Sequence, residues 1–187
     1  MTTRAPSARR DELLERAYRY VTAHGLAELS LRPLAAAVES SPRVLLFLFD
    51  SKEGLVRALL ARARQDELAF LERGRAEHDG QGLSVGVRVM WRWLSAEEHR
   101  PLLGLWAEAY ALSLVQPDGP WAGFGRQTVD DWLDVLAATQ PADRRDTEAG
   151  SAERTLALAV LRGALLDLLA TGDVDRTTAA VERYAAH

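Results

Sequence analysis

Two positively charged side chains stand at the starts of consecutive predicted helices. Arg43 follows Ser41 and Pro42, and Lys52 follows Ser51; serine and proline are favoured at the first positions of helices. A helix start carries partial positive charge, so a cation there is disfavoured by about 0.3–1 kcal/mol. The same end of a helix binds phosphate through its free N–H groups. Two cations at two helix starts therefore indicate an external anion, although both also fit ordinary solvated positions.

The segment around these cations has the spacing of a helix-turn-helix. Residues 31–48 read as a short helix, a three-residue turn and a second short helix. In that motif the second helix enters the DNA major groove and offers its N-terminal residues to the base edges. Arg43 is the one residue of this second helix that could form a strong bidentate contact, through two hydrogen bonds to a guanine. The alternative is a plain pair of packed helices, since short helix pairs are common.

Charge and composition agree with a nucleic-acid partner for the front of the chain. The protein has 187 residues and a formal net charge of −4. Residues 1–66 carry 11 basic and 8 acidic side chains, whereas the remainder carries 12 and 19. A mildly basic front on an acidic body favours a polyanion at the front. The absence of cysteine excludes disulfides, thiolate metal sites and thiol nucleophiles.

Motifs of catalysis and membrane insertion are missing from the sequence. It holds no H-E-x-x-H, no G-x-S-x-G and no glycine-rich phosphate loop, and its four histidines are scattered. We therefore expect a non-enzyme with no metal and no cofactor. Charges interrupt every apolar run before the roughly 20 residues that cross a bilayer, and the N-terminus has no signal-peptide core. We expect a cytoplasmic protein without a membrane partner.

The hydrophobic periodicity is helical throughout, so the predicted fold class is all-α. Apolar residues recur at intervals of three and four, and alternating strand patterns are absent. Glycine-rich residues 74–82 predict a turn, and polar residues 140–151 predict a loop. Predicted helices cover residues 9–24, 31–38, 42–48, 52–73, 83–94, 101–115, 120–139, 152–171 and 174–186.

Residues 9–60 resemble the N-terminal domain of the tetracycline-repressor (TetR) family. The run from Phe49 to Leu55, FDSKEGL, is similar to the family signature F-x-S-K-E-x-L. Gly25 matches a glycine after the first helix, and Ser30 to Arg32 match the start of the second. The resemblance implies a three-helix helix-turn-helix domain, residues 1–51, joined by a long helix to a helical ligand-binding and dimerisation domain, residues 52–187.

The resemblance also implies which residues meet DNA, and two positions depart from it. Glu39 stands where the family has a glycine in the turn, and Leu46 stands where it has a phosphate-binding tyrosine. Losing one neutral hydrogen bond costs about 0.5–1.5 kcal/mol, which weakens binding without abolishing it. The apolar run 44–49 would contact thymine methyls or form a protein-contact patch. The expected DNA-binding residues are Ser30, Arg32, Ser41, Pro42, Arg43, Val44, Leu46, Phe47 and Lys52.

The aromatic residues gather in the part that the resemblance assigns to a small-molecule effector. All five tryptophans lie between residues 91 and 132. Such aromatics also fill ordinary helical cores, which is the alternative. Glu108, alone among apolar neighbours, either pairs with Arg88 or Arg92 or meets a cationic ligand, because an unpaired buried carboxylate is costly. The candidate ligand residues are Met90, Trp91, Trp106, Glu108, Tyr110, Trp121, Phe124 and Trp132.

The last two predicted helices occupy the place of the family's dimer bundle. Gly163 costs about 1 kcal/mol relative to alanine within a helix, and close helix packing would explain it. The alternative is packing within one chain. The candidate interface comprises Leu158, Leu161, Gly163, Leu165, Leu169 and Val181.

Taken together, these observations predict a homodimeric regulator that binds a palindromic double-stranded DNA operator and is released from it by a small-molecule effector. Two-fold pairing would place two recognition helices on successive major-groove faces. The competing hypothesis is a helical ligand-binding or protein-interaction protein whose helix-turn-helix is degenerate.

Overall fold

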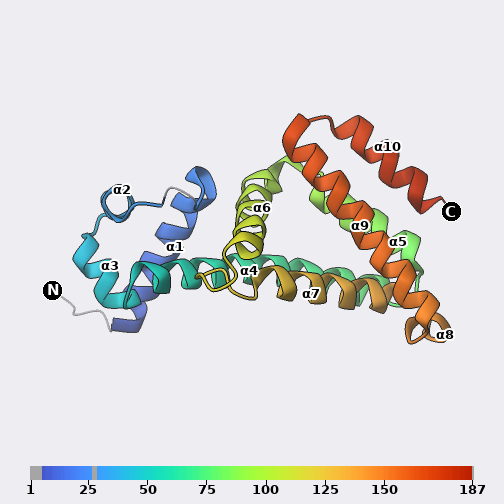
Figure 1. The fold of residues 1–187 in the computed structure, drawn as a ribbon, viewed down its shortest axis with the longest axis horizontal. Coiled ribbons are helices and arrows are strands. Elements are labelled where there is room, and N and C mark those ends of the chain that lie inside the picture. The colour runs from blue at the N-terminus through green and yellow to red at the C-terminus, as the bar shows by residue number, and fades with distance from the viewer. Residues whose placement is uncertain (1–5, 27–28, 187) are drawn as a thin grey trace. The chain divides into compact units, whose positions relative to one another are not determined.

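The computed structural model describes residues 6–26 and 29–186, and these residues form helices joined by turns (Figure 1). The all-α prediction is confirmed. The elements are α1 (Pro6–His24), α2 (Leu31–Ala37), α3 (Pro42–Phe49), α4 (Lys52–His78), α5 (Leu83–Leu94), the 3-10 turn η1 (Glu97–His99), α6 (Arg100–Val115), α7 (Phe124–Thr139), α8 (Ala142–Arg145), α9 (Glu148–Thr171) and α10 (Val174–Ala185).

The chain divides into two compact units. Residues 1–66 and 104–125 form the first unit, and residues 67–103 and 126–187 form the second. The boundary expected after residue 51 falls inside the first unit, which also takes in the first part of α4 and residues 104–125. Among the described residues, no helix combines the length and apolar character needed to span a bilayer.

The first unit has a small apolar core between its N-terminal helices. α1 packs against α2 and α3, and α2 packs against α3. Each helix contributes side chains at the spacing of one helical face, as amphipathic helices do. The fully buried leucines of this core are Leu13 of α1, Leu34 of α2, Leu45 of α3, and Leu55 and Leu59 of α4.

A polar network ties α1 to α4 within the same unit. Arg62 donates to Glu15 at 2.5 Å and to Asp66 at 2.6 Å, and its guanidinium lies 4.7 Å from the centre of the Tyr18 ring. The Tyr18 hydroxyl donates to Asp66 at 2.9 Å. Burial of Tyr18, together with that hydrogen bond, raises the pKa of its phenol. The network fixes the rotation of α4 relative to α1.

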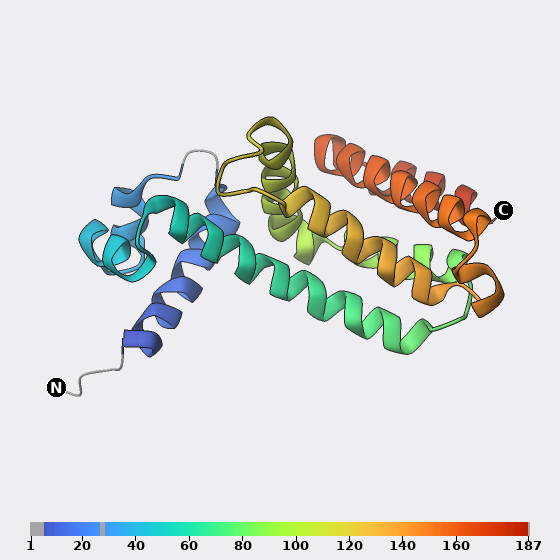
Figure 2. The ribbon, with the colours of Figure 1, turned by 60° about the horizontal axis from the view of Figure 1, so that its bottom comes forward.

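The second unit is built around three mutually packed helices, α5, α9 and α10. Figures 1 and 2 both show α9 and α10 running side by side. α5 is fastened to α10 by two side chains: Arg88 donates to Glu182 at 2.8 Å and to the carbonyl of Ala185, and Trp91 donates to Thr178 at 2.9 Å. Trp91 therefore anchors the C-terminal helix.

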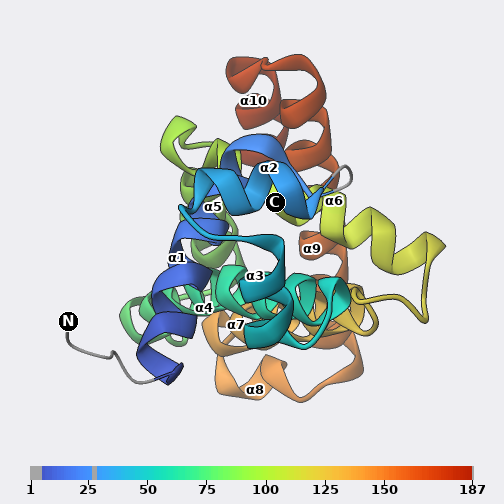
Figure 3. The same cartoon turned by 90° about the vertical axis from the view of Figure 1, so that its left-hand side faces the viewer.

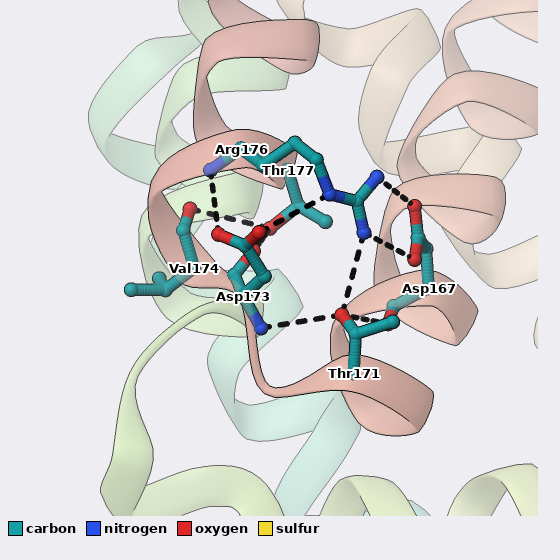
Figure 4. A network of polar contacts seen from close by, with 6 residues as sticks. All are labelled: Asp167, Thr171, Asp173, Val174, Arg176 and Thr177. Atoms are coloured by element: carbon teal, nitrogen blue, oxygen red, sulfur yellow. Dashed lines mark hydrogen bonds and ion pairs between the residues drawn. The ribbon is translucent and has the colours of Figure 1, made fainter.

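The turn between α9 and α10 is closed by an exposed cluster of charges (Figure 4). Gly172 ends α9 with a φ of 72°, a backbone conformation that glycine adopts without strain. Arg176 holds Asp167 with two bonds of 2.7 Å and Asp173 with one of 3.2 Å. The hydrogen bonds from Arg176 lower the pKa of the Asp167 carboxyl. The cluster joins the two helices at their connected ends.

The prediction of a loop over residues 140–151 is wrong. This segment contains α8 and the first residues of α9, which begins at Glu148. The Thr147 hydroxyl caps α9 by accepting the N–H of Gly150 at 3.0 Å. Gln140 is buried, and its amide donates to the carbonyl of Gly150 and accepts from Arg154. A polar segment can thus be ordered when its polar groups find partners inside the fold.

Further boundaries differ from the predictions, most of all at α1, α4 and α7; α1 begins at Pro6 and not at residue 9. α4 continues to His78, beyond the predicted end at residue 73, although Gly74 lies within this stretch. α7 begins at Phe124 and not at residue 120, because residues 120–123 form a turn in which the Phe124 N–H donates to the Trp121 carbonyl at 3.0 Å. Gly123 in this turn has a φ of 77°, which lies outside the right-handed helical region, so residues 120–123 cannot belong to the same continuous helix as α7.

Candidate nucleic-acid interface

The start of α3 has the geometry that the sequence predicts. Ser41 is the N-cap, and its hydroxyl accepts the N–H of Val44 at 3.3 Å, while Pro42 occupies the first helical position. Leu45 and Phe49 are buried and seat the helix on the core. Four expected DNA contacts then lie on the exposed side of this helix: Arg43, Val44, Leu46 and Phe47.

The start of α2 belongs to the same unit and holds further expected contacts; Figure 3 shows α2 next to α3. Ser30 and Arg32 are exposed. Ser30 takes the extended conformation of an N-cap, but its side chain makes no capping hydrogen bond, unlike Ser41. A small open hollow beside it is lined by Tyr20, His24, Gly25, Leu29, Ser30 and Pro33.

Both ends of α3 carry strained backbone. Glu39 before the helix has a φ of 53°, and Asp50 after it has a φ of 66°, in a region that L side chains rarely adopt. Glu39 is the position at which the resemblance expects glycine, and its carboxylate is held by Arg16 at 2.8 Å. Asp50 sits in a tight turn in which the Ser51 N–H donates to the Phe49 carbonyl at 2.8 Å. Such strain persists where the surroundings hold it, and it occurs often at functional sites.

The start of α4 adds Lys52 to the exposed charges of the first unit. The Ser51 hydroxyl accepts the N–H of Gly54 at 2.9 Å and caps the helix. The neighbouring Glu53 is exposed, and hydrogen bonds from its own backbone N–H and from Ser51 lower the pKa of its carboxyl. Gly54 touches the end of α3 closely, since a Cβ atom there would overlap the carbonyl oxygen of Phe49.

Several solved structures share this arrangement over nearly the whole chain. EbrR, a multidrug binding protein crystallised with proflavin, covers 95% of this chain and 98% of its own, with a TM-score of 0.71 and 23% identity. A TetR transcription regulator from Haloarcula marismortui covers 96% and 97%, with a TM-score of 0.72 and 16% identity. A transcriptional regulator from Rhodococcus sp. Rha1 covers 95% and 94%, with a TM-score of 0.74 and 16% identity.

The chain has the TetR fold. No protein-family model and no curated protein matches the sequence. At these identities the likeness establishes the fold, including its helix-turn-helix, whereas the roles of individual residues have to be argued from this chain.

The expected ligand residues of this TetR fold are divided between the two units. The first unit holds Trp106, Glu108, Tyr110, Trp121 and Phe124, and the second holds Met90, Trp91 and Trp132. Trp106 and Tyr110 are half-buried and stack with their ring centres 5.1 Å apart. The other aromatic residues of the set are buried, and Met90 with them.

Glu108 has a partner that the sequence did not suggest. Its carboxylate accepts the backbone N–H of Leu26 at 2.7 Å and lies against Gly25, in the turn that follows α1. Arg88, one of the two arginines considered for it, bonds Glu182 instead, and Arg92 is exposed. Glu108 thus fastens α6 to the turn that follows α1, within the first unit.

One acidic residue of the second unit, Glu67, is buried although the sequence predicts no role for it. Glu67 is only 6% exposed and is the one buried charged side chain among the described residues. Its carboxylate accepts the indole N–H of Trp132. No sequence signal marked it, because Glu67 lies among the charged residues of α4 and only packing reveals its burial.

The candidate dimer residues of this TetR fold face mostly inward. Leu158, Leu161, Leu165 and Val181 are buried within the second unit, Leu169 is half-buried, and Gly163 is exposed. Leu156 and Leu166 of α9, which the sequence analysis did not select, are more than half exposed. The exposed apolar residues of α9 therefore include Leu156 and Leu166, with the exposed Gly163 between them in the sequence.

Proposed function

We propose that this protein is a homodimeric DNA-binding transcriptional regulator whose affinity for a palindromic operator is controlled by a small-molecule effector. One observation carries the DNA-binding part: α3 is seated by Leu45 and Phe49 and presents Arg43 and its neighbours on an exposed face. Ser30, Arg32 and Lys52, at the starts of α2 and α4, supply the phosphate contacts, as helix starts do.

Selection of bound sequences from a random duplex pool with the purified protein tests this function directly. We expect recovery of a palindrome, and a steep fall of log affinity with log salt, because phosphate neutralisation dominates protein–DNA binding. If no duplex is enriched even at low salt, the alternative of a degenerate helix-turn-helix is supported. The exposed apolar side chains of α3 would then serve a protein contact.

We expect Arg43→Ala to weaken binding to the recovered operator by about 1–3 kcal/mol and to relax the preference at one base pair of each half-site. Arg43 is the one exposed side chain of α3 that can form a bidentate bond with guanine. Titration of single-base operator variants measures both effects. Arg92→Ala is the matched control, since Arg92 is exposed on α5. An unchanged sequence preference in Arg43→Ala would contradict the assignment.

The homodimer is supported by the outer face of α9. Leu156, Ala159, Gly163, Leu166 and Ala170 are all exposed and recur at intervals of three and four, so they share one side of the helix. A contiguous apolar patch on a protein surface often marks a site of interaction with another molecule. A second copy packing α9 against α9 would cover this face and pair the two DNA-reading helices.

An aromatic cation is the effector class that the second unit favours. EbrR, which shares the fold, binds proflavin, a planar cation. In this chain the buried Glu67 carboxylate is held by the Trp132 indole, which places a negative charge beside an aromatic ring. Cations are attracted both by a carboxylate and by the face of a tryptophan. Such a ligand releases the operator if it binds better to the state that does not fit DNA.

Proflavin is therefore expected to bind the purified protein and to lower its affinity for the recovered operator. Quenching of tryptophan fluorescence measures binding, and gel retardation measures release. We expect Glu67→Gln, which keeps the size of the side chain and one oxygen able to accept the Trp132 N–H but removes the carboxylate, to reduce proflavin affinity at least tenfold while leaving DNA affinity unchanged. Equal proflavin affinity in Glu67→Gln and in the parent protein would remove Glu67 from the ligand site.

A further inference from the structure

We propose that α3 identifies its operator by methyl groups: Phe47, flanked by Val44 and Leu46, reads the C5 methyl of thymine in the major groove. The inference rests on the proposed function and deepens it. It assigns base discrimination to apolar contact, with a single hydrogen-bonding residue, Arg43, beside it.

The exposed side of α3 is apolar around one cation. Arg43 and Phe47 are four residues apart and therefore neighbours on the helix surface, and Leu46 lies on the other flank of Arg43. Val44 completes the exposed arc beyond Phe47. The opposite side of the helix is buried through Leu45 and Phe49. A groove that receives this helix meets three apolar groups and one guanidinium.

Phe47 is not required to hold the fold together. Its side chain is 80% exposed, the highest value among the exposed large apolar residues. A ring displayed in this way gains apolar burial only when something outside the unit covers it.

The charges around the patch favour DNA as that partner. Arg32, Arg43 and Lys52 are exposed on α2, α3 and α4 of the same unit. Of the nearby acids, Glu39 is paired with Arg16, while Asp50 and Glu53 are exposed at the far end of α3 and the start of α4. An apolar patch on a helix bordered by cations at three helix starts fits the major groove and its phosphate walls.

The major groove offers one apolar group for such a patch. A·T pairs display the thymine methyl, whereas unmodified G·C pairs display only hydrogen-bond donors and acceptors. Covering those polar edges with a phenyl ring would leave them without partners, which is unfavourable. The pairs opposite Phe47 should therefore be A·T, with the thymine on the strand that faces the ring. 5-Methylcytosine carries a methyl group at the same ring position and should be bound better than cytosine there.

Uracil in place of thymine tests the inference, because it removes the methyl group and keeps the base pair. In the operator recovered by selection, each thymine is replaced singly by uracil and the dissociation constant is measured. At the position facing Phe47 we expect about fourfold weaker binding for one half-site, and about fifteenfold for both, as burial of one methyl-sized group predicts. A cytosine placed there should gain affinity when it is replaced by 5-methylcytosine.

Phe47→Ala links the effect to this side chain. The variant should fold as the parent does and bind thymine and uracil duplexes equally. Leu114→Ala is the matched control, since Leu114 is also a largely exposed apolar residue but lies on α6; it should keep the full uracil penalty. Equal binding of thymine and uracil duplexes at every position by the parent protein overturns the inference, and so does an undiminished penalty in Phe47→Ala. Failure to bind any duplex is a distinct result, which overturns the proposed function itself.

Discussion

Replacing Gly54 with alanine is expected to destabilise the first unit by about 2–3 kcal/mol and to weaken operator binding at least tenfold. A Cβ atom at residue 54 would overlap the backbone carbonyl oxygen of Phe49, which is the last residue of α3. A backbone atom cannot move aside as a flexible side chain can, so α3 must shift relative to the start of α4. Overpacking of this kind typically costs about 1–3 kcal/mol.

Gly104→Ala is the matched control for this prediction. Gly104 is also helical, lies in α6 of the first unit and has no atom within 4 Å of the position that a Cβ atom would take. Alanine there should be neutral or stabilising by up to about 1 kcal/mol, since alanine is the better helix former. Denaturant unfolding monitored by circular dichroism measures stability, and gel retardation measures DNA binding. Equal stability of the two variants would show that α3 and α4 are not held in close contact at Gly54.

Replacing Gly163 with leucine is expected to dissociate the dimer, raising its dissociation constant on the order of 100-fold. In the single chain, no atom lies within 4 Å of the place that a Cβ atom would occupy at residue 163. In the proposed homodimer, the second copy would supply the close packing that explains a glycine in the middle of α9. A leucine at this position would separate the two helices and would remove their packing over the flanking Leu156 and Leu166.

The fold of the protomer should tolerate this substitution, because leucine is the better helix former. Sedimentation velocity at several protein concentrations measures the dimer, and far-ultraviolet circular dichroism checks the helices. Gly104→Leu places the same side chain at another exposed, unobstructed helical glycine and should leave the dimer intact. A dimer that persists unchanged in Gly163→Leu would place the interface on another face. A monomeric parent protein would refute the homodimer.

The start of α3 could be predicted from the sequence because it depends on residues within one helical turn. Ser41 and Pro42 define the start of α3 through a capping bond and a missing N–H, and both act within one helical turn. The same is true of Ser51 at the start of α4. The conformation of the turn before α3 could not be predicted in the same way. Glu39 adopts a backbone conformation typical of glycine and is held there by its neighbours, Arg16 among them. No local preference of glutamate predicts that conformation.

Packing between residues far apart in the chain determined which polar side chains are buried. The buried Gln140 and Glu67 are polar residues in polar stretches, and their partners, Gly150 and Trp132, lie elsewhere in the chain. Hydrophobic periodicity predicts that such residues lie on the surface. A pattern of apolar spacing carries no information about the long-range hydrogen bonds that offset the cost of burying a polar group. The start of α9 was missed although its signal is local, since the Thr147 hydroxyl accepts the N–H of Gly150 three residues ahead.

The sequence by itself determined that the chain is helical, where α3 begins and which side chains stand at its start, since these depend on contacts within one or two turns. It did not determine which side of α9 faces the core. Apolar residues lie on every side of α9, between charged residues such as Glu153, Arg162 and Asp167, so the pattern did not separate Leu158 and Leu161 from Leu156 and Leu166. Only the packing of α5 and α10 against it turned the first pair inward and left the second pair exposed, because a helix whose polar residues are not gathered on one side is oriented by its neighbours.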